Sequence, residues 1–202
     1  MITKCLKYLM FAFGLLFSLN ASADVVKSLF HHEQDPVAGN PKGSVTVVEF
    51  FDYQCSHCIN MAPVISAIIK ANPKVRIVFK EYPIRGPMSE IAARAALAAN
   101  MQGKYYEFNH ALMTTSLAMN ENNILDIAKS MGLNVKKLKK DMNSSTVTNV
   151  IQANYALARE LNLTGTPAFF VGKTNAKDSK NLNFTLGEMS QTELQDAINH
   201  AI

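Results

Sequence analysis

A strand, a helix and a second strand follow one another closely between residues 45 and 80, and this order constrains the fold more than any other feature. Val45–Phe51 reads VTVVEFF, a β-branched and aromatic run that is typical of a buried strand. Residues 56–71 predict a helix, in which four apolar residues recur on one side: Ile59, Ala62, Ile65 and Ile69. Residues 75–80 predict the second strand. We expect the two strands to pair in parallel through a right-handed crossover.

The rest of the chain divides into a long helical part and a short strand-rich part. Helical patterns run from Met88 to Leu161, strand patterns return at 168–171 and 183–186, and an amphipathic helix is predicted from residue 192 onwards. A βαβ half and a ββα half are thus separated by an all-helical insertion at about 86–161. This arrangement predicts one α/β domain over 45–202. Residues 24–44 are polar and interrupted by prolines and glycines, so we expect an extended lead-in there.

The first 23 residues have the pattern of a secretory signal peptide. Lys4 and Lys7 precede an apolar run, and Ala21-Ser22-Ala23 supplies the small residues of a cleavage site. The alternative is a membrane anchor, but the apolar run is shorter than the roughly 20 residues that span a bilayer. We therefore expect an exported protein whose mature chain begins at about Asp24.

Removal of this segment changes both the cysteine count and the charge. Cys5 leaves with it, so the remaining 179 of the 202 residues keep only Cys55 and Cys58. One bridge across two residues constrains the unfolded chain very little, which excludes a disulfide-stapled scaffold. The formal net charge falls from +4 to +2 when Lys4 and Lys7 are lost, and this gives no electrostatic case for nucleic acid.

The segment CSHC has three possible roles: a redox dithiol, half of a zinc site or an inert crosslink. It lies where the first predicted strand ends and the first helix begins, so Cys55 is expected at a helix N-terminus. Unpaired backbone N–H groups and the helix dipole favour a thiolate there, and the thiolate is the reactive form. His57 is expected to add a donor or a positive charge within reach of this sulfur. Cys58, one turn further along, should be shielded and react second.

A zinc site would need more ligands than the two cysteines. Structural zinc usually takes four, from a second C-x-x-C or a paired histidine set. Four other histidines show no such spacing: His31, His32, His110 and His200. We therefore predict no metal and no cofactor. A module that binds metal through Cys55, Cys58 and histidines, or a chaperone, remains the alternative from a different functional class.

Together with the helical insertion, the stretch EFFDYQCSHC and the later Gly165-Thr166-Pro167 resemble the DsbA family of thioredoxin-like periplasmic thiol–disulfide oxidoreductases. The resemblance covers about residues 40–202. It implies a thioredoxin-like fold with a central mixed sheet. It also implies that Cys55 is the attacking, solvent-facing thiol and Cys58 the resolving thiol, with His57 stabilising the thiolate. Ser56 stands where the family commonly has proline, so either its hydroxyl donates to Cys55 or the loop is more flexible.

The resemblance assigns two further pairs of residues. Pro167 matches the family's cis-proline, which exposes the backbone of Thr166 as a platform for an extended substrate; the alternative is an ordinary turn proline. Glu49 and Lys80 match an acid and a lysine beneath the dithiol that assist proton movement. The alternative is that both side chains simply reach solvent at strand edges.

These assignments predict a periplasmic enzyme that donates its Cys55–Cys58 disulfide to cysteine pairs of exported proteins. A quinone-linked membrane oxidase of the DsbB type would reoxidise it, and the chain is expected to be a monomer. An isomerase or reductase is the alternative within the same superfamily, favoured by a threonine before Pro167. Against it, only about 20 residues lie between the signal peptide and the first predicted strand, too few for the dimerisation domain that such isomerases usually carry.

Overall fold

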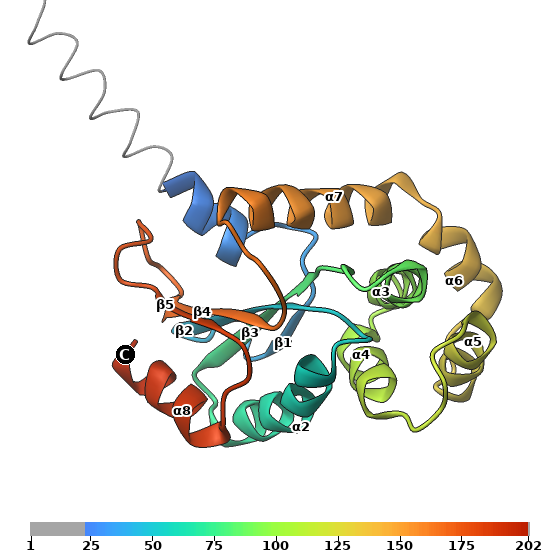
Figure 1. Cartoon of the computed structure of the whole chain (residues 1–202), viewed down its shortest axis with the longest axis horizontal. Coiled ribbons are helices and arrows are strands. Elements are labelled where there is room, and N and C mark those ends of the chain that lie inside the picture. The colour runs from blue at the N-terminus through green and yellow to red at the C-terminus, as the bar shows by residue number, and fades with distance from the viewer. Residues whose placement is uncertain (1–22, 202) are drawn as a thin grey trace, which may run out of the picture.

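The computed structural model describes residues 23–201, and its centre is a five-stranded mixed sheet (Figure 1). The strands lie in the order β1-β3-β2-β4-β5. They are β1 (Val37–Gly39), β2 (Val45–Phe51), β3 (Val75–Glu81), β4 (Ala168–Lys173) and β5 (Asn183–Leu186). Strands β2 and β3 pair in parallel and the other neighbours are antiparallel. The predicted mixed sheet with βαβ and ββα halves is confirmed.

The central strand β2 divides the core into two layers because its side chains alternate between the faces of the sheet. Every residue of β2 is buried. Val47 and Phe51 pack in the layer that contains α2 (Ser56–Ala71), whereas Val48 and Phe50 pack on the opposite face. In Figure 1, α2 and α8 (Gln191–His200) lie below the sheet, and α7 (Ser145–Glu160) and the N-terminal helix lie above it.

Helix α2 forms the predicted crossover between β2 and β3, but its buried face is shifted by one residue from the expected one. The buried side chains are Cys58, Met61, Ile65 and Ile68. Ile59, which we expected on this face, is 40% exposed. The buried face follows from where the helix starts: with Cys55 as the N-cap residue, Cys58 points back towards the sheet.

The insertion is helical throughout, as predicted. Its helices are α3 (Pro87–Asn100), α4 (Tyr105–Thr114), α5 (Glu121–Ser130), α6 (Val135–Met142) and α7. Helix α3 contacts each of the other four. Its buried face is largely alanine, and such small side chains let the neighbouring helices approach closely.

The lead-in differs from the extended segment that we expected. Residues 23–30 form a helix, and β1 pairs antiparallel with β3. Three apolar residues of this helix are buried against the sheet: Val26, Leu29 and Phe30. Burial of this apolar stripe drives helix formation, whereas the sequence interpretation gave weight to the prolines and glycines that follow. The predicted signal peptide lies almost wholly outside the described residues. Within residues 23–201, no helix combines the length and apolar character needed to cross a membrane.

Candidate active site

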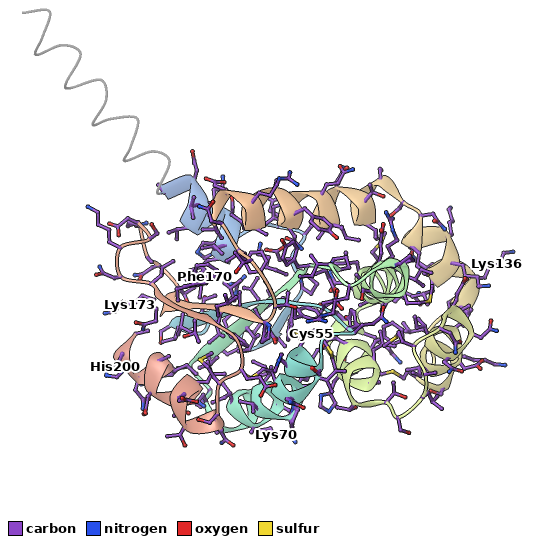
Figure 2. The ribbon with its side chains drawn as sticks, viewed as in Figure 1. Cys55, Lys70, Lys136, Phe170, Lys173 and His200 are labelled. Atoms are coloured by element: carbon purple, nitrogen blue, oxygen red, sulfur yellow. The ribbon has the colours of Figure 1, made fainter. Side chains whose placement is uncertain are left out.

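The two cysteines lie where β2 gives way to α2, at the position predicted from the sequence. Cys55 is the N-cap residue of α2, with extended backbone angles. The turn before it is held by Asp52, whose Oδ1 accepts from the Gln54 N–H at 2.7 Å and whose carbonyl accepts from the Cys55 N–H at 3.2 Å. Figure 2 places Cys55 at the end of α2 next to the sheet, with Lys70 at the other end. The local geometry therefore brings the first sulfur to a helix N-terminus.

Both thiols are free, and both are buried. Cys55 is 0% exposed and Cys58 is 1% exposed. The prediction that Cys55 faces solvent is therefore wrong for this structure. Its sulfur lies under the segment before β4, where Cys55 Sγ donates to the Thr166 carbonyl oxygen at 3.3 Å. Ser56 and His57, between the cysteines, are exposed.

The Thr166–Pro167 segment meets the dithiol from a distant part of the chain. The peptide bond between these two residues is cis. The Thr166 carbonyl bonds Cys55, as described above, while the Thr166 hydroxyl oxygen is buried without a hydrogen-bond partner. The structure thus brings Thr166 and Pro167 to Cys55, as the resemblance implied.

The two thiols differ strongly in acidity. Burial acts to raise the pKa of Cys55, but the neighbouring side chains of Thr166 and Cys58 and the positive charge of Arg85 outweigh it, so the pKa lies below its ordinary value. Burial, reinforced by the carboxyl group of Glu49, holds the pKa of Cys58 well above the ordinary value. At neutral pH the thiolate is therefore concentrated on Cys55, which suits it to be the nucleophile.

His57 does not bond the Cys55 sulfur, contrary to our expectation. Its Nδ1 lies 2.6 Å from Glu188 Oε1, and the same oxygen accepts from Asn60 Nδ2 at 2.8 Å. The His57 side chain is 62% exposed and faces away from the protein interior. The positive charge that acts on Cys55 comes from Arg85, in the loop after β3.

Glu49 and Lys80 are both buried, but they lie on opposite faces of the sheet. Glu49 lines a cavity of about 10 Å³ together with Cys58, Asn109 and His110. Lys80 forms an ion pair with Asp35 and donates to the Ser28 carbonyl at 2.6 Å. The register pairs Lys80 with Phe50, the neighbour of Glu49, and successive strand residues face opposite ways. The predicted proton-transfer pair is therefore not formed, although Glu49 does lie beside Cys58.

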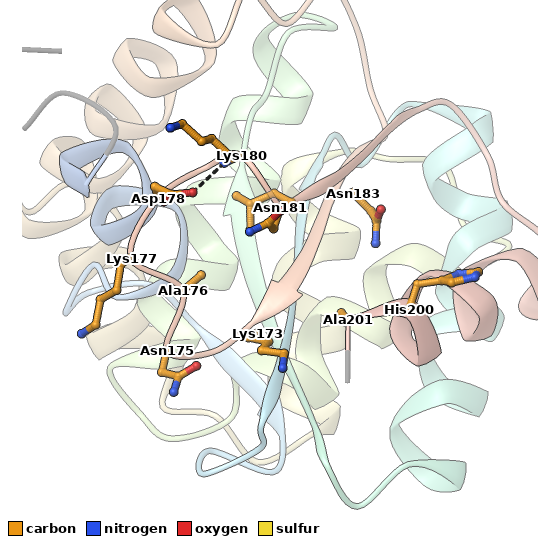
Figure 3. Close-up of a pocket in the computed structure, with 11 residues that line it drawn as sticks. Lys173, Asn175, Ala176, Lys177, Asp178, Lys180, Asn181, Asn183, His200 and Ala201 are labelled. Carbon is orange, nitrogen blue, oxygen red and sulfur yellow. Dashed lines mark hydrogen bonds between the residues drawn. The ribbon is translucent and has the colours of Figure 1, made fainter. Parts of the chain in front are cut away.

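A second, broader cavity of about 770 Å³ lies far from the dithiol (Figure 3). It is lined by the loop after β4 and the end of α8, including Lys173, Lys177 and His200. Lys173 pairs with Val45, at the start of β2, whereas Cys55 follows the end of β2. A strand of seven residues spans roughly 20 Å. This cavity is therefore separate from the candidate active site.

Comparison with known proteins decides the family. The model of the DSBA-like thioredoxin domain matches residues 46–199. The chain belongs to this family. The fold and the C-x-x-C of this chain are those of a DSBA-like thioredoxin domain.

Several solved structures are similar to this chain over almost the whole described fold. A thioredoxin-like oxidoreductase from Silicibacter pomeroyi is 44% identical, with a TM-score of 0.79 over 87% of this chain and 96% of that one. BcfH from Salmonella enterica Typhimurium is 31% identical, with a TM-score of 0.74 over 98% and 90% of the two chains. The thiol-disulfide exchange protein alpha-DsbA2 from Wolbachia pipientis is 26% identical, with a TM-score of 0.77 over 90% and 96%.

Curated relatives include much longer proteins. A Na(+)/H(+) antiporter, NhaA 3 of Salinispora tropica, is 27% identical over 141 residues, which is 69% of this chain and 22% of the antiporter. The chain thus spans about a fifth of the length of the curated relatives it matches.

The DSBA-like site contains a buried network that the sequence interpretation missed. Glu81 Oε1 accepts from the Tyr53 hydroxyl at 2.9 Å and from the Tyr105 hydroxyl at 2.7 Å, and Asn109 donates to the Tyr53 oxygen at 3.0 Å. Burial raises the pKa of Glu81 well above its ordinary value, although the hydrogen bonds from the two tyrosines act to lower it. The network joins the residue two before Cys55 to helix α4. An acid at the end of an apolar strand was its only signal in the sequence.

Glu49 is expected to make the stability of this DSBA-like domain depend on pH. Burial, with a smaller contribution from Cys55, raises the pKa of Glu49 from 4.5 to about 8. Folded Glu49 therefore keeps a proton that the unfolded chain releases, so the free energy of unfolding falls as pH rises from about 4.5 to about 8. Urea unfolding across this range should show a weaker pH dependence for Glu49→Gln than for wild type. Glu160→Gln, at an exposed site, is the control, and equal slopes in wild type and Glu49→Gln would contradict the prediction.

Proposed function

We propose that this protein works as an oxidase that donates a Cys55–Cys58 disulfide to cysteine pairs of exported proteins in the periplasm. The observation that carries the proposal is the difference in acidity between the two thiols. Interactions that favour the Cys55 thiolate exist only after reduction, so they stabilise the reduced state relative to the disulfide. A disulfide whose reduced form is stabilised in this way is readily given to another dithiol.

The exchange proceeds in two balanced steps. A substrate thiolate attacks Cys55 Sγ, the Cys55–Cys58 bond breaks, and Cys58 leaves as a thiolate that takes up a proton. The second substrate thiolate then attacks the substrate sulfur of the mixed disulfide, and Cys55 leaves as a thiolate. Two electrons have passed from the substrate to the enzyme. A DsbB-type quinone-linked membrane oxidase would remove them.

Glu49 is placed to handle the proton of Cys58 in this scheme. Its carboxyl raises the pKa of Cys58, and both groups line the same small cavity. A cavity of about 10 Å³ is close to the space that one water molecule requires. Glu49, with its own pKa raised to about 8, can give a proton to Cys58 when that thiolate leaves and recover it later.

The backbone segment before β4 lies beside the dithiol, where an extended substrate would bind, although Thr166 and Pro167 are themselves buried. Thr166 and Pro167 lie against Cys55 at the start of β4, and Ile59 and Ile84 expose apolar side chains at 40% and 41%. The Thr166 segment would pair with substrate main chain as in strand addition. This arrangement favours clients that are still unfolded when they are oxidised.

Equilibrium with glutathione tests the direction of the reaction. We expect the reduction potential of Cys55–Cys58 to lie well above the thioredoxin value of about −270 mV, and the reduced protein to melt at a higher temperature than the oxidised one. The readout is the reduced fraction, followed by alkylation of free thiols across a series of glutathione buffers. A potential at or below the thioredoxin value would favour a reductase and overturn the oxidase proposal.

A metal-binding module is the alternative from a different functional class. Within the described residues, no group of three His, Cys, Asp or Glu side chains lies close enough to hold a metal ion. The Nδ1 atom of His57 is bonded to Glu188, which leaves Nε2 as the one ring nitrogen that could bind a metal. Measurement of zinc content after purification without chelator distinguishes this module from the oxidase.

A further inference from the structure

Glu188 reaches the active site from the far end of the sequence. It lies in the short connection between β5 and α8, and its carboxylate meets His57 across 131 residues of chain. One oxygen, Oε1, bonds both His57 Nδ1 at 2.6 Å and Asn60 Nδ2 at 2.8 Å. His57 and Asn60 lie in the first turns of α2, so this single carboxylate fixes two side chains beside the dithiol.

Backbone hydrogen bonds fix the connection between β5 and α8 before and after Glu188. Before it, the Gly187 N–H donates to the Pro167 carbonyl at 2.8 Å. After it, the Met189 N–H lies 3.3 Å from the Met61 sulfur, and Ser190 caps α8 in a capping box. An exposed ion pair between mobile side chains contributes little. Here the carboxylate is positioned by its backbone, so less conformational entropy is lost when the contact forms.

The contact with Glu188 engages Nδ1 of His57 and fixes the direction in which the imidazole points. His57 is two residues from Cys55, yet the Cys55 sulfur bonds the Thr166 carbonyl and not the imidazole. An imidazolium beside a thiolate stabilises it. The oxidised protein has no thiolate, so the position of His57 changes the energy of one redox state only.

We propose that Glu188 is a positioning residue that holds His57 away from Cys55 and thereby limits the oxidising strength of the enzyme. The inference rests on thiol exchange at Cys55, as proposed above. Glu188 and the Cys55 thiolate compete for one imidazole. Removal of Glu188 therefore releases His57 to the thiolate, stabilises the reduced state and makes the disulfide a stronger oxidant.

A double-mutant cycle tests this competition. The four proteins are wild type, Glu188→Ala, His57→Ala and the double variant, and each is equilibrated with glutathione while the Cys55 pKa is followed by thiolate absorbance. We expect Glu188→Ala to shift the equilibrium towards the reduced form by about tenfold or more, the effect of one hydrogen bond to a charged group, and to lower the Cys55 pKa. In the His57→Ala background, the same change should have less than about half of that effect.

Asp196→Ala is the matched control, because it removes an exposed acid from α8 and alters the net charge equally. It should leave the equilibrium unchanged. An unchanged equilibrium in Glu188→Ala overturns the inference. An equal shift with and without His57 also overturns it, because Glu188 would then act through its charge alone. Failure of the wild-type protein to exchange with glutathione at all would instead overturn the proposed thiol exchange.

Discussion

Replacing Cys55 by alanine is expected to abolish oxidation of a peptide dithiol, with a rate loss of more than about a thousandfold. Every step of the exchange forms or breaks a bond to Cys55 Sγ, and Cys58 cannot take its place because burial and Glu49 hold its pKa far above neutral. The fold should persist, since the sulfur makes one weak hydrogen bond, to Thr166. Circular dichroism of the variant checks this. Activity of Cys55→Ala equal to that of wild type would show that thiol exchange is not the task of this protein.

Cys58→Ala is expected to trap partner proteins on Cys55, whereas Cys55→Ala cannot bind them covalently. Cys55 keeps its nucleophilicity and can still attack a partner disulfide, but escape through Cys58 is no longer possible. Mixed disulfides with exported proteins or with a reoxidising partner should accumulate and appear on non-reducing gels of a periplasmic extract. Cys55→Ala is the matched control and should trap nothing, so bands common to both variants would argue against a Cys55-linked intermediate.

Breaking the buried ion pair between Lys80 and Asp35 by removing one partner is expected to cause the largest loss of stability. Both side chains are 1% exposed, and Lys80 also bonds the Ser28 carbonyl in the N-terminal helix. Burial lowers the pKa of Lys80 and raises that of Asp35, so each charge depends on its partner. Lys80→Ala removes the nearest positive charge from the buried Asp35 carboxylate and leaves only the weaker effects of His32 and Arg76, which should lower the free energy of unfolding by about 3–5 kcal/mol.

Two comparisons distinguish the loss of a partner in a buried ion pair from the effect of removing any lysine. Lys137→Ala breaks an ion pair with Asp141 in which the lysine is 46% exposed, and should cost less than about 1 kcal/mol. The double variant Lys80→Met with Asp35→Leu should recover most of the loss, because it removes both charges and keeps apolar volume. Urea unfolding measures all of these values. The reduction potential of the double variant should stay at the wild-type value; a changed potential would restore a role for Lys80 in the redox chemistry.

The sequence by itself was sufficient to predict features that depend on residues close together along the chain. A β-branched run, a C-x-x-C and a helical pattern place Cys55 at a helix N-terminus, because each element is fixed by its own periodicity and end signals. The parallel pairing of β2 and β3 follows from the short helical crossover between them. The resemblance also led to the cis peptide bond before Pro167.

Tertiary structure decided where the side chains around the dithiol point. Glu49 and Lys80 looked like partners, but the register of β2 on β3 places Lys80 beside Phe50 and therefore on the opposite face from Glu49. His57 is turned by a carboxylate 131 residues away, and Cys55 is covered by Thr166 from 111 residues away. Contacts between such distant residues depend on strand register and helix packing, which local periodicity does not encode. The sequence therefore determined which residues form the proposed redox centre, and packing determined which neighbours surround it.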